Sequence, residues 1–302
     1  MKRFIYLYIL VLIVACTSGT QTSKEADHFQ CVTLLGDTLF TPELKDSQAL
    51  NNYLEAQKNY ESNTDDPTAL IWYGRRAAYL GQYKEAIRLF SLGIEKHPED
   101  ARFYRHRGHR YISTRQFELA ISDLEKAKEL TTQSEDMVEP DGLPNSKNIP
   151  LTTLKGNIFY HLALSYYLQN NIDAAGGTIM FGSLFDKYDD NIVSTAQWFY
   201  MTLRRMNEKK SAMLLLQGIN KEMDIIENMS YHQMCLFYKG ELTEDELKID
   251  DVALYSLGNW YLYEKNDKTK AKEYWSKLLK EGNPYSFAYI ACEADWARLF
   301  ND

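Results

Sequence analysis

The sequence predicts an all-α fold in which short antiparallel helical hairpins stack side by side as an α-solenoid. The first observation is an internal repeat, because the windows 67–100 and 101–134 align at an offset of 34 residues without a gap. The second is that helical apolar spacing continues through the rest of the body. The third is that alternating strand patterns are nearly absent outside residues 29–40. We therefore expect about five hairpins and a capping helix.

The N-terminus has the pattern of a secretion signal over residues 1–15. Lys2 and Arg3 precede a short apolar run, whose helix of about 18 Å would not span the roughly 30 Å hydrocarbon core of a membrane. Small Ala15 directly before Cys16, followed by polar residues, resembles the lipobox of bacterial lipoproteins. That resemblance implies cleavage before Cys16 and lipidation of Cys16, which would anchor the chain to a membrane. A plain signal peptide that ends near a cysteine is the alternative.

Two further segments follow the signal. Residues 16–45 are expected to form a lipidated tether and then an extended arm, since 29–40 partly alternates and turns at Gly36. Residues 46–302 are expected to form the solenoid. No acidic pair directly follows the cysteine, so we expect an anchor in the bacterial outer membrane with the body facing the periplasm.

The body behind the anchor is acidic. Without the two basic residues of the signal, the 34 basic residues of the chain become 32 against 42 acidic ones, a net charge of about −10. Such a body repels nucleic acid and anionic headgroups, so we expect no nucleic-acid partner. Cys31, Cys235 and Cys292 have no close metal-binding spacing. Cys235 and Cys292 lie in apolar helical stretches and are expected to be buried free thiols, with a disulfide as the alternative.

The two aligned windows resemble the tetratricopeptide repeat. The first window has that repeat's small residue, aromatic, alanine, large apolar residue and proline at Gly74, Tyr83, Ala86, Phe90 and Pro98. It departs from the repeat at Gly93, where alanine is usual, and the second window lacks the proline. The resemblance implies that small residues allow two antiparallel helices to approach closely, while bulky residues fill the space between hairpins.

Later units are more degenerate. Residues 156–189 follow the repeat, 192–219 form a hairpin with altered spacing, and 252–279 follow the repeat again with one inserted residue. A last amphipathic helix at 286–300 is expected to cap the stack. The segment 131–152 interrupts the repeats and contains three prolines. We expect it to be an ordered cover, with a flexible loop as the alternative.

Inward positions on the first helices of such hairpins line a concave groove, and they supply the candidate binding residues. These are Arg75, Tyr79, Arg102, Arg105, His109, Asn157, Tyr160 and Tyr167. Arginine binds carboxylates and phosphates through two-point contacts. The arrangement is similar in principle to the carboxylate clamp of some tetratricopeptide-repeat proteins, although the Lys and Asn residues of that clamp are not matched. The alternative is that the arginines pair with acidic residues of the 131–152 loop.

Signals for catalysis and metal binding are weak. His106 and His109 are three residues apart on a predicted helix, but neighbouring arginines would repel a cation. Common hydrolase, metalloprotease and phosphate-loop motifs are absent from the sequence. Glu227, Tyr231 and His232 are interpreted as residues that cap and pack a helix. We expect no enzyme, no cofactor and no metal, with an unrecognised hydrolase as an alternative.

Residues 190–300 resemble the NlpI family of repeat-containing outer-membrane lipoproteins. The likeness lies in Trp198-Phe199-Tyr200, the stretch 236–245 and the stretch 257–271, in that order. The family forms homodimers and acts as an adaptor for cell-wall endopeptidases. The resemblance therefore implies a membrane-anchored, protein-binding scaffold in the bacterial cell envelope that pairs as a homodimer. The alternative is a ligand-binding module that takes an acidic peptide or glycan in its groove.

Overall fold

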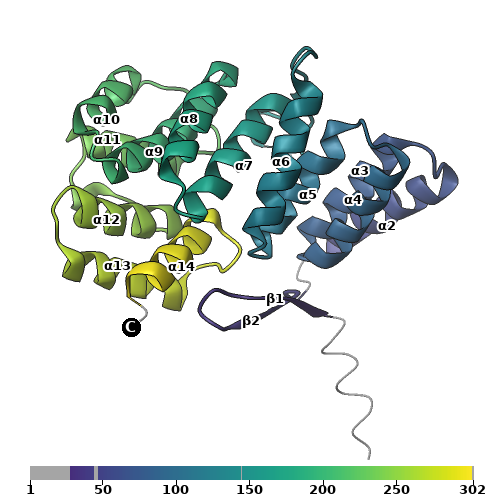
Figure 1. Ribbon diagram of the computed structural model, residues 1–302, viewed down its shortest axis with the longest axis horizontal. Helices are drawn as coiled ribbons and strands as arrows, with labels where there is room; N and C mark the ends of the chain where they lie inside the picture. Colours follow the sequence, from purple (N-terminus) through teal and green to yellow (C-terminus); the bar gives the residue numbers. More distant parts are fainter. Residues whose placement is uncertain (1–27, 44–46, 144, 301–302) are drawn as a thin grey trace, which may run out of the picture.

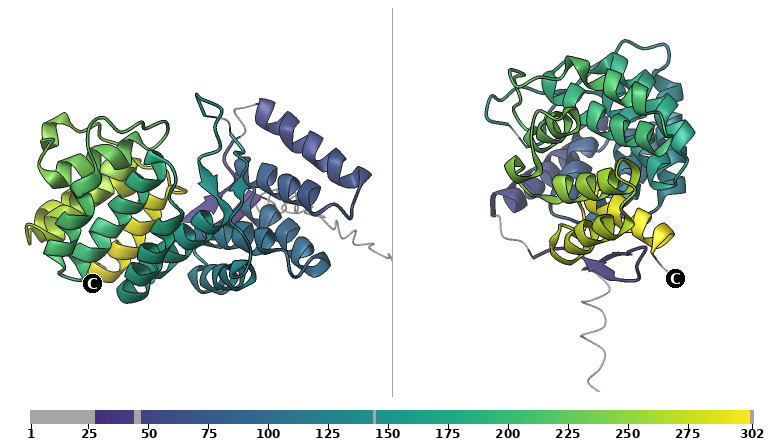
Figure 2. Two further views of the ribbon diagram at one scale, coloured as in Figure 1. Left: turned by 90° about the horizontal axis from the view of Figure 1, so that it is seen from above. Right: turned by 90° about the vertical axis from the view of Figure 1, so that its left-hand side faces the viewer.

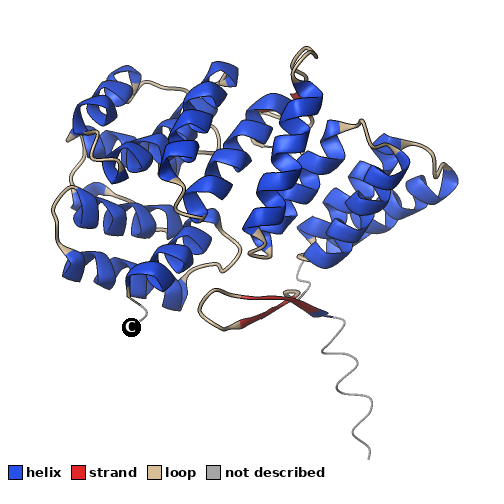
Figure 3. Cartoon of the chain, viewed as in Figure 1, coloured by secondary structure: helices blue, strands red, loops and turns tan. Residues whose placement is uncertain are grey.

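The computed structural model describes residues 28–43, 47–143 and 145–300. These ranges contain thirteen α-helices and two small two-stranded sheets, which confirms the predicted all-α class (Figure 1, Figure 3). The predicted signal peptide 1–15, the lipidation site Cys16 and the polar tether lie outside the described residues. Within the described part, none of the helices combines the length and the apolar character needed to span a membrane.

Five helical hairpins form most of the described body. They are α3 (Pro67–Tyr79) with α4 (Tyr83–Lys96), α5 (Ala101–Ser113) with α6 (Phe117–Thr131), α7 (Leu154–Leu168) with α8 (Ile172–Gly182), α9 (Asp189–Arg205) with α10 (Lys209–Leu215), and α12 (Asp251–Tyr263) with α13 (Lys268–Glu281). Each hairpin turns at a residue in the left-handed region, with φ between 53° and 73°: Gly81, Arg115, Asn170, Asn207 and Asn266. Glycine and asparagine adopt this conformation at the lowest cost, so four of the five turns use favourable residues.

Three of the described helices lie outside the hairpins. Helix α2 (Ser47–Ser62) packs on α3, and α11 (Met229–Lys239) packs on α9. Helix α14 (Phe287–Leu299) packs on α12 and α13 and also reaches α7. The hairpins from α3 to α8 stand side by side, whereas α9 to α14 form a compact block at the other end (Figure 1, Figure 2). The last helix therefore turns back towards the middle of the array.

Close approach of the helices explains two glycines of the repeat. A Cβ atom on Gly74 would lie 2.4 Å from Cε1 of Phe90, so only glycine lets α3 and α4 cross at this distance. A Cβ atom on Gly93 would lie 2.1 Å from Cε1 of Phe103, on the next hairpin. Glycine stands where alanine is usual because the Phe103 ring occupies the space that a methyl group would need.

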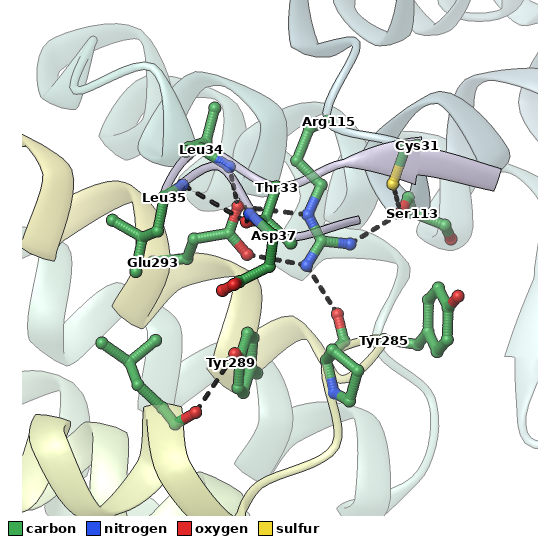
Figure 4. Close-up of polar contacts among 12 residues, drawn as sticks. Cys31, Thr33, Leu34, Leu35, Asp37, Ser113, Arg115, Tyr285, Tyr289 and Glu293 are labelled. Atoms are coloured by element: carbon green, nitrogen blue, oxygen red, sulfur yellow. Dashed lines mark hydrogen bonds and ion pairs between the residues drawn. The ribbon is translucent and has the colours of Figure 1, made fainter. Parts of the chain in front are cut away.

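The predicted extended arm is a β-hairpin of β1 (Phe29–Val32) and β2 (Thr38–Phe40), which turns at Gly36 with φ 94°. It lies across the C-terminal end of α5 and the face of α14 (Figure 4). There the Arg115 guanidinium forms an ion pair of 2.7 Å with the Glu293 carboxylate, and the two side chains are 2% and 0% exposed. The Leu34 amide also donates to Glu293, while Arg115 donates to the carbonyl oxygens of Ser113 and Pro284.

The segment between α6 and α7 is an ordered loop. Its strands β3 (Val138–Glu139) and β4 (Thr152–Thr153) pair antiparallel, and the Leu154 amide donates to the Met137 carbonyl. The three cysteines of the described residues, Cys31, Cys235 and Cys292, are buried and free. This agrees with the free thiols predicted for Cys235 and Cys292.

Candidate functional site

A cavity of about 430 Å³ lies on the inner face of α3, α5 and α7, the first helices of the first three hairpins. The β3–β4 loop covers one side of the cavity. The segments before α9 and α11 and the start of α14 enclose the others. Its wall includes six of the eight predicted binding residues: Arg75, Tyr79, Arg105, His109, Asn157 and Tyr160. The repeat register therefore places most of the candidates around one cavity.

Arg102 lies outside this cavity. Its guanidinium donates to the carboxylate of Asp100, the N-cap residue of its own helix, at 2.9 Å from Nε. A second contact joins it to the Thr68 hydroxyl oxygen at 3.2 Å. The first turn of α5 thus uses this arginine to stabilise the helix start and the neighbouring hairpin.

Tyr167 also lies outside the cavity, in the core. Its side chain is buried, and its hydroxyl oxygen accepts hydrogen bonds from Tyr255 at 2.8 Å and Asn259 at 3.0 Å. The Arg205 guanidinium stacks 4.3 Å from its ring centre. Position 12 of the third repeat would face an open groove in an extended array, but here α9, α12 and α14 fold back over it.

The loop occupies part of the arginine-rich wall. Arg75 donates to the Pro140 carbonyl oxygen at 2.7 Å, and Arg76 donates to the Gly142 carbonyl oxygen at 2.8 Å. The Arg105 guanidinium forms an ion pair of 2.9 Å with the Glu139 carboxylate, and both side chains are almost fully buried. The pairing of Arg105 with the loop, one of the two alternatives from the sequence, is therefore present in the structure.

Beyond Glu139 lies a smaller compartment of about 100 Å³, which we call the arginine compartment. Its wall carries three guanidinium groups, from Arg75, Arg105 and Arg110, and one carboxylate, from Glu139. Burial lowers the pKa of Arg110 to about 10, and the like charges of Arg105 and Arg75 act in the same direction. Burial also lowers the pKa of Arg105. The compartment holds more positive than negative charge, and this excess lies in a desolvated space.

Three histidines lie beside these arginines, and we call them the cavity histidines: His106 and His161 are buried, and His109 is half-buried. Burial and the neighbouring guanidinium groups lower the pKa of each well below the ordinary value near 6.5. The rings of His109 and His161 have centres 4.3 Å apart, and Phe287 of α14 packs 5.3 Å from His109. These imidazoles are neutral at pH 7, so the positive charge of this wall comes from arginine alone.

The part of the larger cavity away from the arginine compartment is acidic. Asp141 of the loop, Asp186 before α9 and Glu227 before α11 line it, and none of the three lines the arginine compartment. Burial raises the pKa of Asp186 to about 6. Burial, then the nearby Asp141 and Asp190 carboxylates, raise the pKa of Glu227. A cation placed here would offset the desolvation of these carboxylates.

The structure does not bring Glu227, Tyr231 and His232 together at one site. Glu227 and Tyr231 face the cavity, whereas His232 is buried elsewhere with Nε2 at 2.8 Å from the Asn220 carbonyl oxygen. In the parts of the chain that the structure describes, no three His, Cys, Asp or Glu side chains gather with a geometry for a metal ion. What the cavity offers is hydrogen bonding and charge, which suit binding.

Several cavity residues have no signal in the sequence as groove residues. Asp186 and Phe287 lie in a connecting segment and at the start of the last helix, outside the inward repeat positions. Arg110 and His161 lie on the first helices, but one residue away from the positions that face an open groove. The covering of the groove by later segments brings these residues into the site.

Comparison with known proteins finds similarity only at the level of structure, since no known protein family and no curated protein matches the sequence. One similar solved structure is YrrB, a TPR protein with an unusual peptide-binding site, at 17% identity and a TM-score of 0.44, covering 80% of this chain and 97% of that one. Another is TTC0263, a thermophilic TPR protein in Thermus thermophilus, at 15% identity and a TM-score of 0.46, covering 63% and 93%. The APC/C hetero-tetramer Cut9–Hcn1 matches at 15% identity and a TM-score of 0.48, covering 84% of this chain and 44% of that one.

Proposed function

We propose that this protein is a lipid-anchored scaffold of the bacterial cell envelope, which binds a segment of a partner protein in the cavity between its stacked hairpins. The anchor is Cys16, and the body faces the periplasm from the outer membrane. In this role the protein organises cell-wall enzymes or proteases, and pairs of copies bring two partners together.

One observation carries the binding proposal: the first helices of three successive hairpins supply polar and aromatic side chains to one cavity of about 430 Å³. A space of this size lies within the range of about 300–1,000 Å³ that ligand pockets occupy. Buried arginines there are poised for charge-assisted hydrogen bonds, which are stronger than neutral ones.

Affinity capture from detergent-solubilised envelope, followed by mass spectrometry, tests this function. The wild-type protein should retain a stoichiometric protein partner. Asn157→Trp, which fills the cavity with an indole and changes no charge, should lose that partner, as should Arg75→Glu. Arg88→Glu, on the exposed side of α4, is the matched control for charge reversal and should retain it. Circular dichroism should verify that each variant is folded. Equal capture by the wild type and both cavity variants would contradict the proposal.

The cavity is walled by several segments of the chain besides the three first helices, which favours a second candidate, a module that binds a small soluble ligand such as an acidic peptide or glycan fragment. Titration calorimetry with soluble cell-wall fragments distinguishes this candidate from the scaffold. Binding of a fragment without any retained protein partner would favour the module.

A further inference from the structure

The cavity and the arginine compartment adjoin and carry opposite charge. They share five wall residues: Arg75, Tyr79, Arg105, His109 and Glu139. Arg110 lines only the smaller space, while Asp141, Asp186 and Glu227 line only the larger one. A ligand that extends from one space into the other therefore meets guanidinium groups at one end and carboxylates at the other.

The arginine compartment has a charge that its own chain does not balance. Glu139 pairs with Arg105 at 2.9 Å. Arg75 is satisfied by a neutral carbonyl oxygen, that of Pro140, and by the Tyr79 hydroxyl at 3.3 Å. Among the described residues, the contact found for the Arg110 guanidinium is with the ring of Tyr83, 5.3 Å from its centre. Desolvated guanidinium groups without an anion are costly, so an entering carboxylate would be stabilised.

The acidic part of the larger cavity has an excess of negative charge. Asp186 and Asp141 are half-buried and Glu227 is exposed, and partial desolvation by the surrounding protein raises the pKa of each carboxyl group. Of the residues that the structure describes, no arginine or lysine lines the larger cavity except Arg75 and Arg105. The charge of Arg75 reaches Asp141 and lowers the pKa of its carboxyl group against the effect of burial, whereas no arginine or lysine acts in this way on Asp186 or Glu227. An ammonium group at this end would meet carboxylates on three different segments of the chain, and each would regain part of the stabilisation it loses on leaving water.

We propose that the cavity binds a short peptide or the end of a peptide chain that carries a free carboxylate, held by Arg75, Arg105 and Arg110, and an ammonium group a few residues away, held by Asp186, Glu227 and Asp141. This inference rests on the proposed function, because it names the chemistry of the segment that enters the cavity. The ammonium is the free amino group of a short peptide or a lysine side chain near the carboxyl end. Aromatic rings that line the same cavity, from Tyr160, Tyr231 and Phe287, pack against the peptide.

The test uses three tetrapeptide libraries of the same composition, one with both ends free, one with an amidated carboxyl end and one with an acetylated amino end. The purified protein is equilibrated with each library, and retained peptides are identified by mass spectrometry. We expect retention of the free library to exceed that of the amidated library by at least about ten-fold, the effect of one lost charge-assisted hydrogen bond. In the acetylated library, retained peptides should be those that contain lysine.

Two variants assign the ends of the ligand. Arg110→Gln should lower retention of peptides with a free carboxylate by about ten-fold, whereas Arg88→Gln, at an exposed arginine of α4, should not. Asp186→Asn should abolish the requirement for an ammonium group, whereas Asp173→Asn, at an exposed position of α8, should leave it unchanged. Both cavity substitutions remove a charge and keep a polar side chain, and circular dichroism verifies that the variants fold.

Equal retention of the free and amidated libraries would overturn the inference, as would retention of no peptide or binding of inorganic phosphate alone. Failure of this inference can be distinguished from failure of the proposed function. A protein partner captured through Arg75 and Asn157, with no preference for peptide ends, would leave the scaffold intact and reject only the doubly charged ligand. If the cavity variants capture the protein partner as well as the wild type does, and the free and amidated libraries are retained equally, both proposals are rejected.

Discussion

The buried ion pair between Arg115 and Glu293 gives the sharpest test of the fold. We consider Glu293→Gln, which removes the negative charge but keeps an oxygen that can accept the hydrogen bond from the Leu34 amide. The Arg115 guanidinium, 2% exposed, would remain charged and would have only neutral acceptors, namely the carbonyl oxygens of Ser113 and Pro284 and the amide oxygen of the new side chain. Removing one partner of a buried pair costs about 3–5 kcal/mol.

The assay is equilibrium unfolding in urea, monitored by circular dichroism. With a slope of about 2–3 kcal/mol per molar urea, the loss should lower the midpoint by about 1–2.5 M. The matched control is Glu85→Gln at the exposed Arg88–Glu85 pair on α4, where the effect should stay within about 1 kcal/mol. The double variant Arg115→Met with Glu293→Leu removes both charges and should be less destabilised than Glu293→Gln. A loss below about 1 kcal/mol for Glu293→Gln would refute the reasoning, because that is the effect of an exposed pair.

Three other outcomes follow from the packing and the buried groups. Gly258→Ala should destabilise the protein by about 1–3 kcal/mol, because its Cβ would lie 2.2 Å from Nε1 of Trp275, whereas Gly177→Ala, with no atom within 4 Å, should stabilise α8 by about 0.5–1 kcal/mol. Urea midpoints that move in the same direction for both glycines would contradict this account. The cavity histidines have lowered pKa values, so the unfolded chain takes up protons below pH 6.5 that the folded chain does not. The free energy of unfolding should then fall by about 1 kcal/mol for each histidine between pH 6.5 and 5.5, because the unfolded imidazole goes from half to mostly protonated over this range. The carboxyl group of Asp186, whose pKa is raised to about 6, takes up a proton in the folded chain over the same range and partly offsets this loss. Stability that is constant or rises on acidification in this range would be inconsistent with neutral buried imidazoles. Burial raises the pKa of the Cys235 thiol, so a thiol reagent at about pH 8 should label it only in urea, and rapid labelling of the folded protein would show that it is not buried.

The hairpins could be predicted from the sequence because the interactions that form them are local. Gly74 and Phe90 lie within one hairpin, and the spacing between them recurs in the next window, so the contact is visible as a repeat. The arm at residues 29–40 was predicted for the same reason, since its strands and the turn at Gly36 are contiguous.

The cavity was predictable only in part, since its walls come from distant parts of the chain. The repeat register identified the wall formed by α3, α5 and α7. It could not show that Tyr167 would be covered by Tyr255, which is 88 residues away in the sequence. Asp186 and Glu227 lie in connecting segments with no fixed repeat position, so only the return of the later hairpins over the groove places them at the site.

The tie between the turn after α5 and the last helix has a consequence for how the cavity meets a ligand. An open array of hairpins behaves as a spring, whose curvature changes easily because each unit touches only its neighbours. Here the start of α14 carries Phe287 against His109 of α5, and the Arg115–Glu293 contact fixes the separation of these two helices. The cavity walls on α5 and α14 are thus held at a fixed separation before a ligand binds. A ligand need not compress the superhelix, and more of its contact energy is available as affinity.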